Sequence, residues 1–495
     1  MISDDKKNRI SDTPRDIAVI GMAGRFPGAR NIDEFWFNLE NSSDAVSEVT
    51  RWPLGDRFSA SAPKPGKTYC RWGAFLEDID RFDPLFFNIP PKQADGMDPR
   101  QRLMLEVVWE TLEHAGYAGG RLSETTTGVF IGASDNQYLF LKQQRMEDHF
   151  NGLDNSSGAI ANRISFFFEW FGPSLTMDTT CSSSLMAVHS ACQSIRQGES
   201  ETAIAGGIHL ILLPDYYVTM SQMKLLSPDS RHRVMDRQAR GFIPGEGAGA
   251  VLLKPLDRAE KDNDTIYGVI KGSAANFSGK TDQMAVPNPA ALETVIRRAL
   301  AQSEVEPETV SYIELNGAGT PLGDYAEMQA LTAAYHTDFR QDGKCPVGSV
   351  KTNIGNLEAA SGIAGFIKVL LSMNHQTIPA TLHFEKGNRF INWKKAPFSV
   401  ITQSRGWTHE AYPRRAGISS FGVGGTNVHL IAEAHGTGFH KSSPAAGAGP
   451  DASDRVPVIV TLSAHRVGVL TVLVANLKNT WRPRAGRILT TFPIP

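Results

Sequence analysis

Residues 174–198 read SLTMDTTCSSSLMAVHSACQSIRQG, and this stretch carries the clearest local signal in the sequence. After Cys181 the apolar residues recur at helical spacing until Gly198, which is placed to cap the helix. The pattern predicts that Cys181 lies where a helix begins. Unpaired backbone N–H groups and the positive end of the helix dipole stabilise a thiolate and a developing oxyanion at such a position. We therefore expect Cys181 to be a nucleophile with a lowered pKa.

The composition is that of an ordinary globular protein, with 495 residues, 41% hydrophobic, 21% charged and a formal net charge of -2. This balance indicates neither nucleic acid nor a membrane surface as the main partner. The N-terminus lacks the apolar core of a secretory signal, and no apolar run reaches the roughly 18 residues of a membrane helix. We expect a soluble, cytoplasmic protein.

The remaining cysteines, Cys70, Cys192 and Cys345, form no CxxC pair and no zinc-like spacing with histidine. We interpret them as reduced structural thiols of the core. The sequence contains no motif for a metal, a nucleotide or a nucleic acid, so no bound cofactor is expected.

Strand-like and helical patterns alternate from Asp16 to about residue 434, which predicts an α/β fold with buried sheets. The specific expectations are a strand at IAVIGM, a Gly/Pro turn at GMAGRFPGA (21–29), a helix over 100–116, and strands over 128–134, 202–212 and 247–254.

The two ends of the chain differ in composition from this region. Residues 1–15 are charged, and we expect them to be flexible. Residues 435–455 are rich in Gly, Ala, Ser and Pro and predict a linker. Residues 456–495 begin like a strand but are too short for a domain, so we interpret them as the stub of a following domain or linker subdomain.

The stretch DTTCSSSL (178–185) closely resembles the nucleophile motif of the ketosynthases of modular polyketide synthases. Further blocks resemble the same family, in the family's order and over roughly residues 16–434: VIGMAGRFPGA (19–29), MDPRQRLMLEVVWETLEHAG (97–116), SQMKLLSPD (221–229), GFIPGEGAGAVLLKPLDRA (241–259), IELNGAGTPLGD (313–324), VKTNIGNLEAASGIAG (350–365) and GISSFGVGGTNVHLI (417–431).

The resemblance implies a thiolase-like fold, with two related α/β halves stacked as five layers (αβαβα). The first half, residues 16–260, would carry the nucleophile, and the second, residues 261–434, would carry two histidines and a lysine. The family forms homodimers and works with upstream and downstream acyl carrier proteins, which present the acyl chain on a phosphopantetheine arm. The segments 266–281 and 286–289 look most like synthases whose acyltransferase is a separate protein.

The sequence departs from the family at both histidines. Asn316 stands in ELNGAGT where the family has EAHGTGT, and Asn356 stands in NIGNLE where the family has NIGHLE. Lys351 matches the family lysine. In the family the two imidazoles assist decarboxylation of a malonyl extender and bind the enolate oxygen. Asparagine does not titrate and cannot carry a proton as imidazole does.

These substitutions favour an acyltransferase of the ketosynthase family that is non-elongating: Cys181 would accept an acyl chain and pass it on without forming a carbon–carbon bond. Two alternatives stay open. One is a catalytically silent dimerising and docking scaffold, and the other is a condensing ketosynthase with a rearranged site.

Three further residues bear on the acyl tunnel that the resemblance implies. Thr180 replaces the family's alanine and adds bulk beside Cys181. Phe421 fits the family, but Val423 stands where a second phenylalanine commonly gates the tunnel. The backbone N–H groups of Val423 and Cys181 are expected to form the oxyanion hole. We expect a looser gate and a more permissive acyl pocket.

Overall fold

The computed structural model describes residues 16–61, 63–145, 155–283, 285–335, 343–408 and 412–436, together with 471, 474 and 475. The chain divides into two compact units, Met1–Phe439 and His440–Pro495, and nearly all described residues belong to the first. The expectations for residues 1–15, 437–455 and most of 456–495 lie outside the described residues. Within these ranges, no helix is both long and apolar enough to cross a membrane.

A single mixed sheet runs through the first unit, and its strand order is β12-β10-β9-β14-β15-β8-β1-β7-β6-β4-β5. Its strands are β1 (Ile17–Arg25), β4 (Thr127–Ala133), β5 (Ser174–Met177), β6 (Thr202–His209), β7 (Gly247–Pro255), β8 (Gly268–Phe277), β9 (Tyr312–Glu314), β10 (Cys345–Gly348), β12 (Phe398–Val400), β14 (Arg415–Phe421) and β15 (Thr426–Glu433). Two short pairs lie apart from it, namely β2 (Ser47–Glu48) with β3 (Trp72–Gly73) and β11 (Thr377–Ile378) with β13 (Arg405–Gly406).

The two halves of this sheet repeat one topology. In the first half, β7 pairs antiparallel with both β1 and β6, and β4 pairs parallel with β6 and β5. In the second half, β15 pairs antiparallel with both β8 and β14, and β9 pairs parallel with β14 and β10. The halves join where β1 pairs with β8. This duplication confirms the predicted thiolase-like fold.

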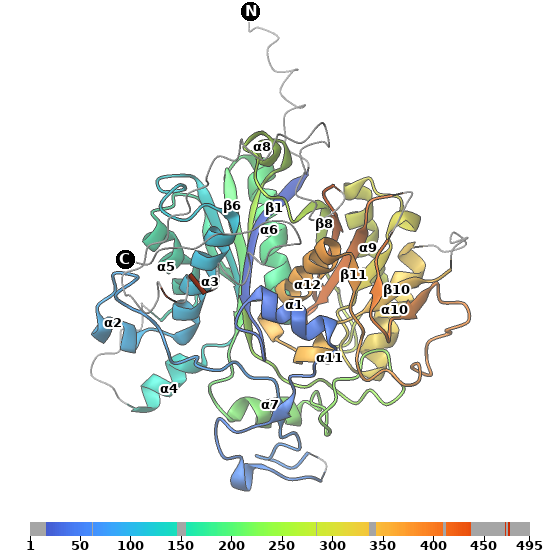
Figure 1. The fold of residues 1–495 in the computed structure, drawn as a ribbon. Coiled ribbons are helices and arrows are strands. Elements are labelled where there is room, and N and C mark those ends of the chain that lie inside the picture. The colour runs from blue at the N-terminus through green and yellow to red at the C-terminus, as the bar shows by residue number, and fades with distance from the viewer. Residues whose placement is uncertain are drawn as a thin grey trace, which may run out of the picture. The chain divides into compact units, whose positions relative to one another are not determined.

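The two halves of the sheet form two layers of the fold, and helices form the other three. Figure 1 shows α6 (Ser183–Gln197) and α12 (Ser361–His375) between the two halves of the sheet. Helices α3 (Pro99–Ala115) and α5 (Ala159–Phe168) pack on the first half, whereas α9 (Pro289–Ser303) packs on the second and α10 (Pro321–Tyr335) packs on α9. The remaining helices are α1 (Ile32–Glu40), α2 (Pro91–Gly96), α4 (Gln137–Arg145), α7 (Asp215–Gln222), α8 (Leu256–Lys261) and α11 (Lys351–Ile354).

The helix predicted over 100–116 is confirmed as α3. Asp98 caps its first turn by accepting a hydrogen bond from the Arg100 N–H (2.8 Å), and Gly116 ends it with a φ of 74°. The strands predicted over 128–134, 202–212 and 247–254 are confirmed as β4, β6 and β7, although β6 ends at His209.

The turn predicted at residues 21–29 is wrong in its first part, because β1 continues to Arg25. A Cβ atom at Gly21 would lie 2.6 Å from the carbonyl oxygen of Thr111 in α3. Glycine therefore allows this strand to pack closely against a helix, which composition alone cannot distinguish from a turn.

Candidate active site

The predicted nucleophile, Cys181, lies at a helix start, as expected. It belongs to a 3-10 turn, η2 (Thr180–Ser182), that leads directly into the central helix α6. The residue is 4% exposed, and its carbonyl oxygen accepts a hydrogen bond from Ser420 Oγ (2.9 Å) in β14. The nucleophile is thus held by the second half of the fold as well as by its own helix.

Thr180, directly before the nucleophile, has a φ of 57°, in the left-handed region that is costly for a β-branched residue. Its buried Oγ1 has no hydrogen-bond partner in the described part of the chain. The backbone of Gly422 packs against this turn, since a Cβ there would lie 2.3 Å from the Thr179 carbonyl oxygen. Thr180 therefore shapes the turn that carries Cys181.

Asn316 follows β9 and is held by its own backbone and by its side chain. Its N–H and that of Gly317 donate to the two carboxylate oxygens of Glu327 at 2.7 and 2.9 Å. Its side-chain Oδ1 accepts a hydrogen bond from the Phe421 N–H at 3.1 Å. The side-chain amide N–H₂ of Asn316 is then the part of this residue that can serve the cavity beside it.

Asn356 lies beside the sulfur of the nucleophile. Ser361 Oγ donates to Asn356 Oδ1 (2.8 Å), which turns Nδ2 toward Cys181 Sγ at 3.7 Å. The backbone of Asn356 is fixed by two hydrogen bonds to the segment at Ile243 and Gly245 (2.7 and 2.9 Å). The side-chain amides of Asn316 and Asn356 can therefore each donate a hydrogen bond, but neither can accept a proton.

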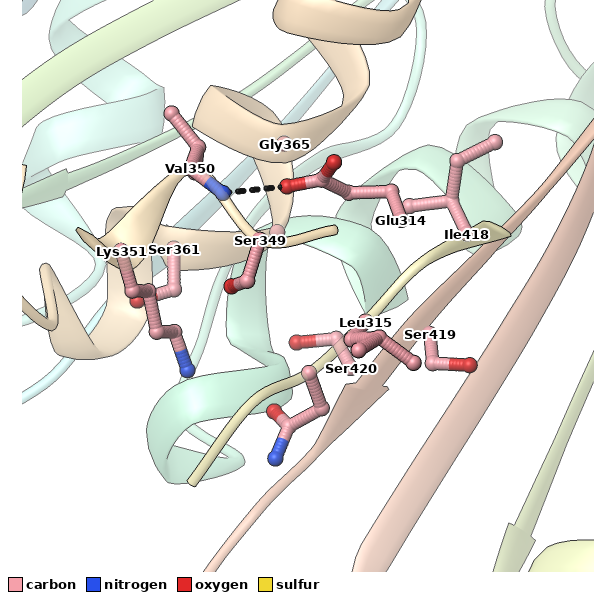
Figure 2. A pocket seen from close by; sticks show the side chains of 12 residues that line it. Glu314, Leu315, Ser349, Val350, Lys351, Ser361, Gly365, Ile418, Ser419 and Ser420 are labelled. Atoms are coloured by element: carbon pink, nitrogen blue, oxygen red, sulfur yellow. Dashed lines mark hydrogen bonds between the residues drawn. The ribbon is translucent and has the colours of Figure 1, made fainter. Parts of the chain in front are cut away.

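Lys351, at the start of α11, is buried and lines the same cavity as Cys181 and both asparagines. Figure 2 shows Lys351 with its neighbours, among which Glu314 accepts a hydrogen bond from the Val350 N–H (2.7 Å). The other Glu314 oxygen pairs with the fully buried Lys368 ammonium (2.8 Å). This buried pair ties the end of β9 to α12 and so supports both Asn316 and Lys351.

Glu358 and Tyr216, which had no predicted role, belong to the site: Glu358 contacts Cys181, and Tyr216 contacts Glu358. The Cys181 thiol donates to Glu358 Oε2 at 3.0 Å, and Tyr216 OH donates to Glu358 Oε1 at 2.8 Å. Glu358 lies only two residues after Asn356, and its charge in the otherwise uncharged stretch 352–367 was a signal that could have found it. The sequence offers no local signal for Tyr216, because this residue belongs to α7 and is separated from Glu358 by 142 positions.

The charge state of the nucleophile differs from the expectation. Burial raises the pKa of the Cys181 thiol, the Glu358 carboxylate adds to that increase, and the Lys351 ammonium opposes it. The predicted lowering of the Cys181 pKa is wrong, because burial and the neighbouring carboxylate raise that pKa. These effects favour the thiol over the thiolate in the resting site.

A cavity of about 630 Å³ opens beside these groups. Cys181, Asn316, Lys351, Asn356, Phe421 and Val423 all line it, and most of its other lining residues are apolar, among them Leu225, Phe242, Val286, Leu292 and Leu322. Thr180 is not among the lining residues. The cavity therefore combines one nucleophile with a largely apolar wall.

Three family models match the chain in succession. They are the N-terminal domain of β-ketoacyl synthase over residues 14–259, its C-terminal domain over residues 267–385, and the ketoacyl-synthetase C-terminal extension over residues 388–489. A solved ketosynthase from module 6 of the bacillaene synthase of Bacillus subtilis 168 is 39% identical, with a TM-score of 0.80, covering 85% of this chain and 72% of that one. The chain belongs to the β-ketoacyl synthase family.

The ketosynthase is also similar to the oxazolomycin ketosynthase domain of Streptomyces albus JA3453. That structure is 38% identical, has a TM-score of 0.82, and is matched over 85% of this chain and 76% of that one. Among curated proteins, polyketide synthase PksL of Bacillus subtilis (strain 168) is 40% identical over 493 residues, or 96% of this chain. The ketosynthase spans only 10% of the length of PksL. It is thus a ketosynthase domain of the modular polyketide synthase type.

Proposed function

We propose that this ketosynthase transfers acyl chains without elongating them. Cys181 accepts an acyl chain from the phosphopantetheine arm of an upstream acyl carrier protein, and a downstream carrier then removes it. One observation carries the proposal: Cys181 lines a substrate-sized cavity together with Asn316 and Asn356. The resemblance to the family expects histidines where these two asparagines stand.

The two half-reactions of the family need different groups. Transfer of the acyl chain needs a thiol nucleophile and hydrogen-bond donors for the oxyanion. The backbone N–H groups of Cys181 and Val423 are the proposed donors, and the Val423 N–H has no hydrogen-bond acceptor among the described residues. Acyl transfer therefore keeps both of its requirements.

Condensation loses its requirements at the same positions. Loss of one positioned oxyanion donor typically costs about 100- to 1,000-fold in rate, and general acid–base help is worth a further ~100- to 10,000-fold. The two losses belong to one catalytic unit and are not multiplied, but either alone makes elongation slow. The side-chain amides of Asn316 and Asn356 can still orient a bound thioester.

The proposed partners rest on an exposed edge of the sheet and on the likeness to the family. Strand β5 is an edge of the sheet, and its Leu175 is 50% exposed. The nearby Phe166 and Phe171 are 80% and 73% exposed. An unpaired edge with apolar side chains favours pairing with a second copy of the chain, so we propose a homodimer. Carrier proteins would supply the acyl chains, and the likeness of residues 266–281 to one synthase class supports a separate acyltransferase.

The test follows the acyl group by mass. An acyl carrier protein loaded with a short acyl chain is mixed with the purified ketosynthase, and intact-protein mass spectrometry measures acylation of Cys181. The Cys181→Ala variant is the control and must stay unmodified. Absence of acylation on the wild-type protein would contradict the proposal and favour a silent scaffold.

A second stage separates transfer from condensation. Malonyl carrier protein is added to the acylated ketosynthase, and both CO₂ release and the length of the product are measured. We expect the acyl chain to move unchanged to a downstream carrier. A product two carbons longer would instead support a condensing enzyme with a rearranged site.

A further inference from the structure

The Cys181 sulfur has two hydrogen-bond partners in the described part of the chain, and one of them can accept a proton. The thiol donates to Glu358 Oε2 at 3.0 Å, whereas Asn356 donates its own N–H to the sulfur at 3.7 Å. No histidine among the described residues lies within hydrogen-bond distance of the sulfur. The Cys181 thiol therefore faces the carboxyl group of Glu358.

We propose that Glu358 is the general base that activates Cys181 for acyl transfer, in a site where both imidazoles have been lost. The inference deepens the proposed function and rests on it. It identifies a catalytic residue, because the Glu358 carboxylate contacts the reacting thiol directly.

The position of the carboxylate is built into the fold. Glu358 begins the 3-10 turn η4 (Glu358–Ala360), with a φ of 43°, a left-handed conformation that is costly for a residue with a side chain. The turn packs against β6, since a Cβ at Gly207 would lie 2.8 Å from the Ala359 carbonyl oxygen. Tyr216 OH donates to Glu358 Oε1 at 2.8 Å and leaves Oε2 for the thiol. Surrounding structure therefore holds a strained residue with one oxygen directed at the sulfur.

The charges around Glu358 suit a base. Burial raises its pKa, and Asp135, in the loop after β4, raises it further, whereas hydrogen bonds from Cys181 and Tyr216 and the charge of Lys351 lower it. His209 in β6 lies beside Tyr216, with ring centroids 5.8 Å apart, and burial lowers its pKa to about 3, so it adds no positive charge at neutral pH. A carboxyl group with a raised pKa is a better proton acceptor near neutral pH than an ordinary glutamate.

The proton is conserved through the reaction. As the Cys181 sulfur attacks the thioester carbonyl carbon, its proton moves to Glu358 Oε2 and a carbon–sulfur bond forms. The bond to the pantetheine sulfur then breaks, and Glu358 returns the proton to that departing thiolate. Transfer to the downstream carrier is the same sequence in reverse, with Glu358 taking the proton of the incoming pantetheine thiol.

The substitution Glu358→Gln tests the proposal, because it keeps the side-chain shape and an oxygen acceptor for Tyr216 but removes the base. Two rates are measured from pH 5.5 to 9: acylation of Cys181 by an acyl carrier protein, and alkylation of Cys181 by iodoacetamide. Alkylation needs no carrier, so it tests Glu358 even if the proposed acyl transfer fails. Glu106→Gln is the matched control, because burial raises the pKa of Glu106 to about 7 on helix α3, outside the site.

We expect the wild-type rates to reach a plateau once Glu358 is ionised. In Glu358→Gln both rates should fall at least ~100-fold at pH 6.5 and should rise in proportion to hydroxide concentration up to pH 9. Glu106→Gln should behave as the wild type. Equal or faster rates in Glu358→Gln would overturn the proposal, since a carboxylate that only repels the thiolate predicts faster reaction.

A second variant keeps the proposal testable if Glu358→Gln does not fold, which its thermal unfolding midpoint shows. Tyr216→Phe removes the hydrogen bond that stabilises the Glu358 carboxylate, so the acid limb of the wild-type alkylation profile should move to higher pH. An unmoved acid limb in a folded Tyr216→Phe protein would count against Glu358 as the base.

Discussion

The Phe421 N–H donates a hydrogen bond to Asn316 Oδ1 at 3.1 Å, and this contact fixes the orientation of the Asn316 side-chain amide. A backbone N–H donor can form a hydrogen bond only with the oxygen of that amide, so the amide NH₂ group is left for the cavity. A histidine at the same position could accept the same N–H through Nδ1 and present Nε2–H to a substrate. The backbone around the site is thus compatible with an imidazole at this position.

This relationship predicts that condensation can be restored. The double substitution Asn316→His with Asn356→His should raise decarboxylation of malonyl carrier protein by at least ~100-fold, because it returns two donors and a proton carrier to the enolate site. The measurement is CO₂ release with detection of the elongated product. Cys181→Ala in the same background must abolish elongation, and an unchanged rate would mean that the loss lies outside these two positions.

The cavity wall at Val423 predicts a change in acyl selectivity. Val423→Phe should reduce acylation of Cys181 by long or branched chains by about 10-fold or more and leave acetyl transfer nearly unchanged, because a ring would fill part of the cavity. Competition between acyl carriers, read by intact mass, measures the ratio. Val423→Ala keeps the same backbone N–H and is the control. Unchanged acylation across chain types in Val423→Phe would contradict the idea of a loosened gate.

The turn before the nucleophile predicts a stability gain. Thr180→Ala should raise the free energy of unfolding by about 1 kcal/mol, because it removes a buried hydroxyl without a partner and a β-branched side chain from left-handed backbone. Urea unfolding of both proteins measures the difference. Thr180→Ser keeps the hydroxyl and should recover only part of the gain, so equal stability of the alanine and serine variants would remove the hydroxyl from the explanation.

Two buried carboxyl groups beneath the Asn316 loop predict a pH dependence of stability. Burial raises the pKa of Glu327 to about 7 and that of Asp324 to about 8, whereas both titrate near pH 4 in an unfolded chain. Between these values the folded protein keeps protons that the unfolded chain has lost, so the free energy of unfolding falls as pH rises from about 4 to about 8. Urea titrations at fixed ionic strength should show this slope in the wild type and a shallower one in Glu327→Gln. Identical slopes in the two proteins would assign the pH dependence to other groups.

Local patterns were enough to predict much of the site. Cys181 was found from its helix-start motif, and Asn316, Lys351, Asn356 and Val423 were found from short blocks that keep their spacing. Such features can be recognised in a sequence because a turn, a cap or a motif involves residues that are neighbours in the chain. The sequence did not predict the packing of β1 against α3, because a glycine that allows close packing cannot be distinguished by composition from a glycine in a turn.

The sequence by itself predicted the family and the thiolase-like fold, since the motifs that carry both are short and local in the chain. It also predicted Cys181, Asn316 and Asn356 as residues of one site. Only the tertiary structure showed that Cys181 is buried and that its thiol contacts Glu358. Cys181 and Glu358 are separated by 177 positions, and Tyr216 and Glu358 by 142. Burial and proximity arise when distant segments pack together, and these two effects raise the pKa of the Cys181 thiol.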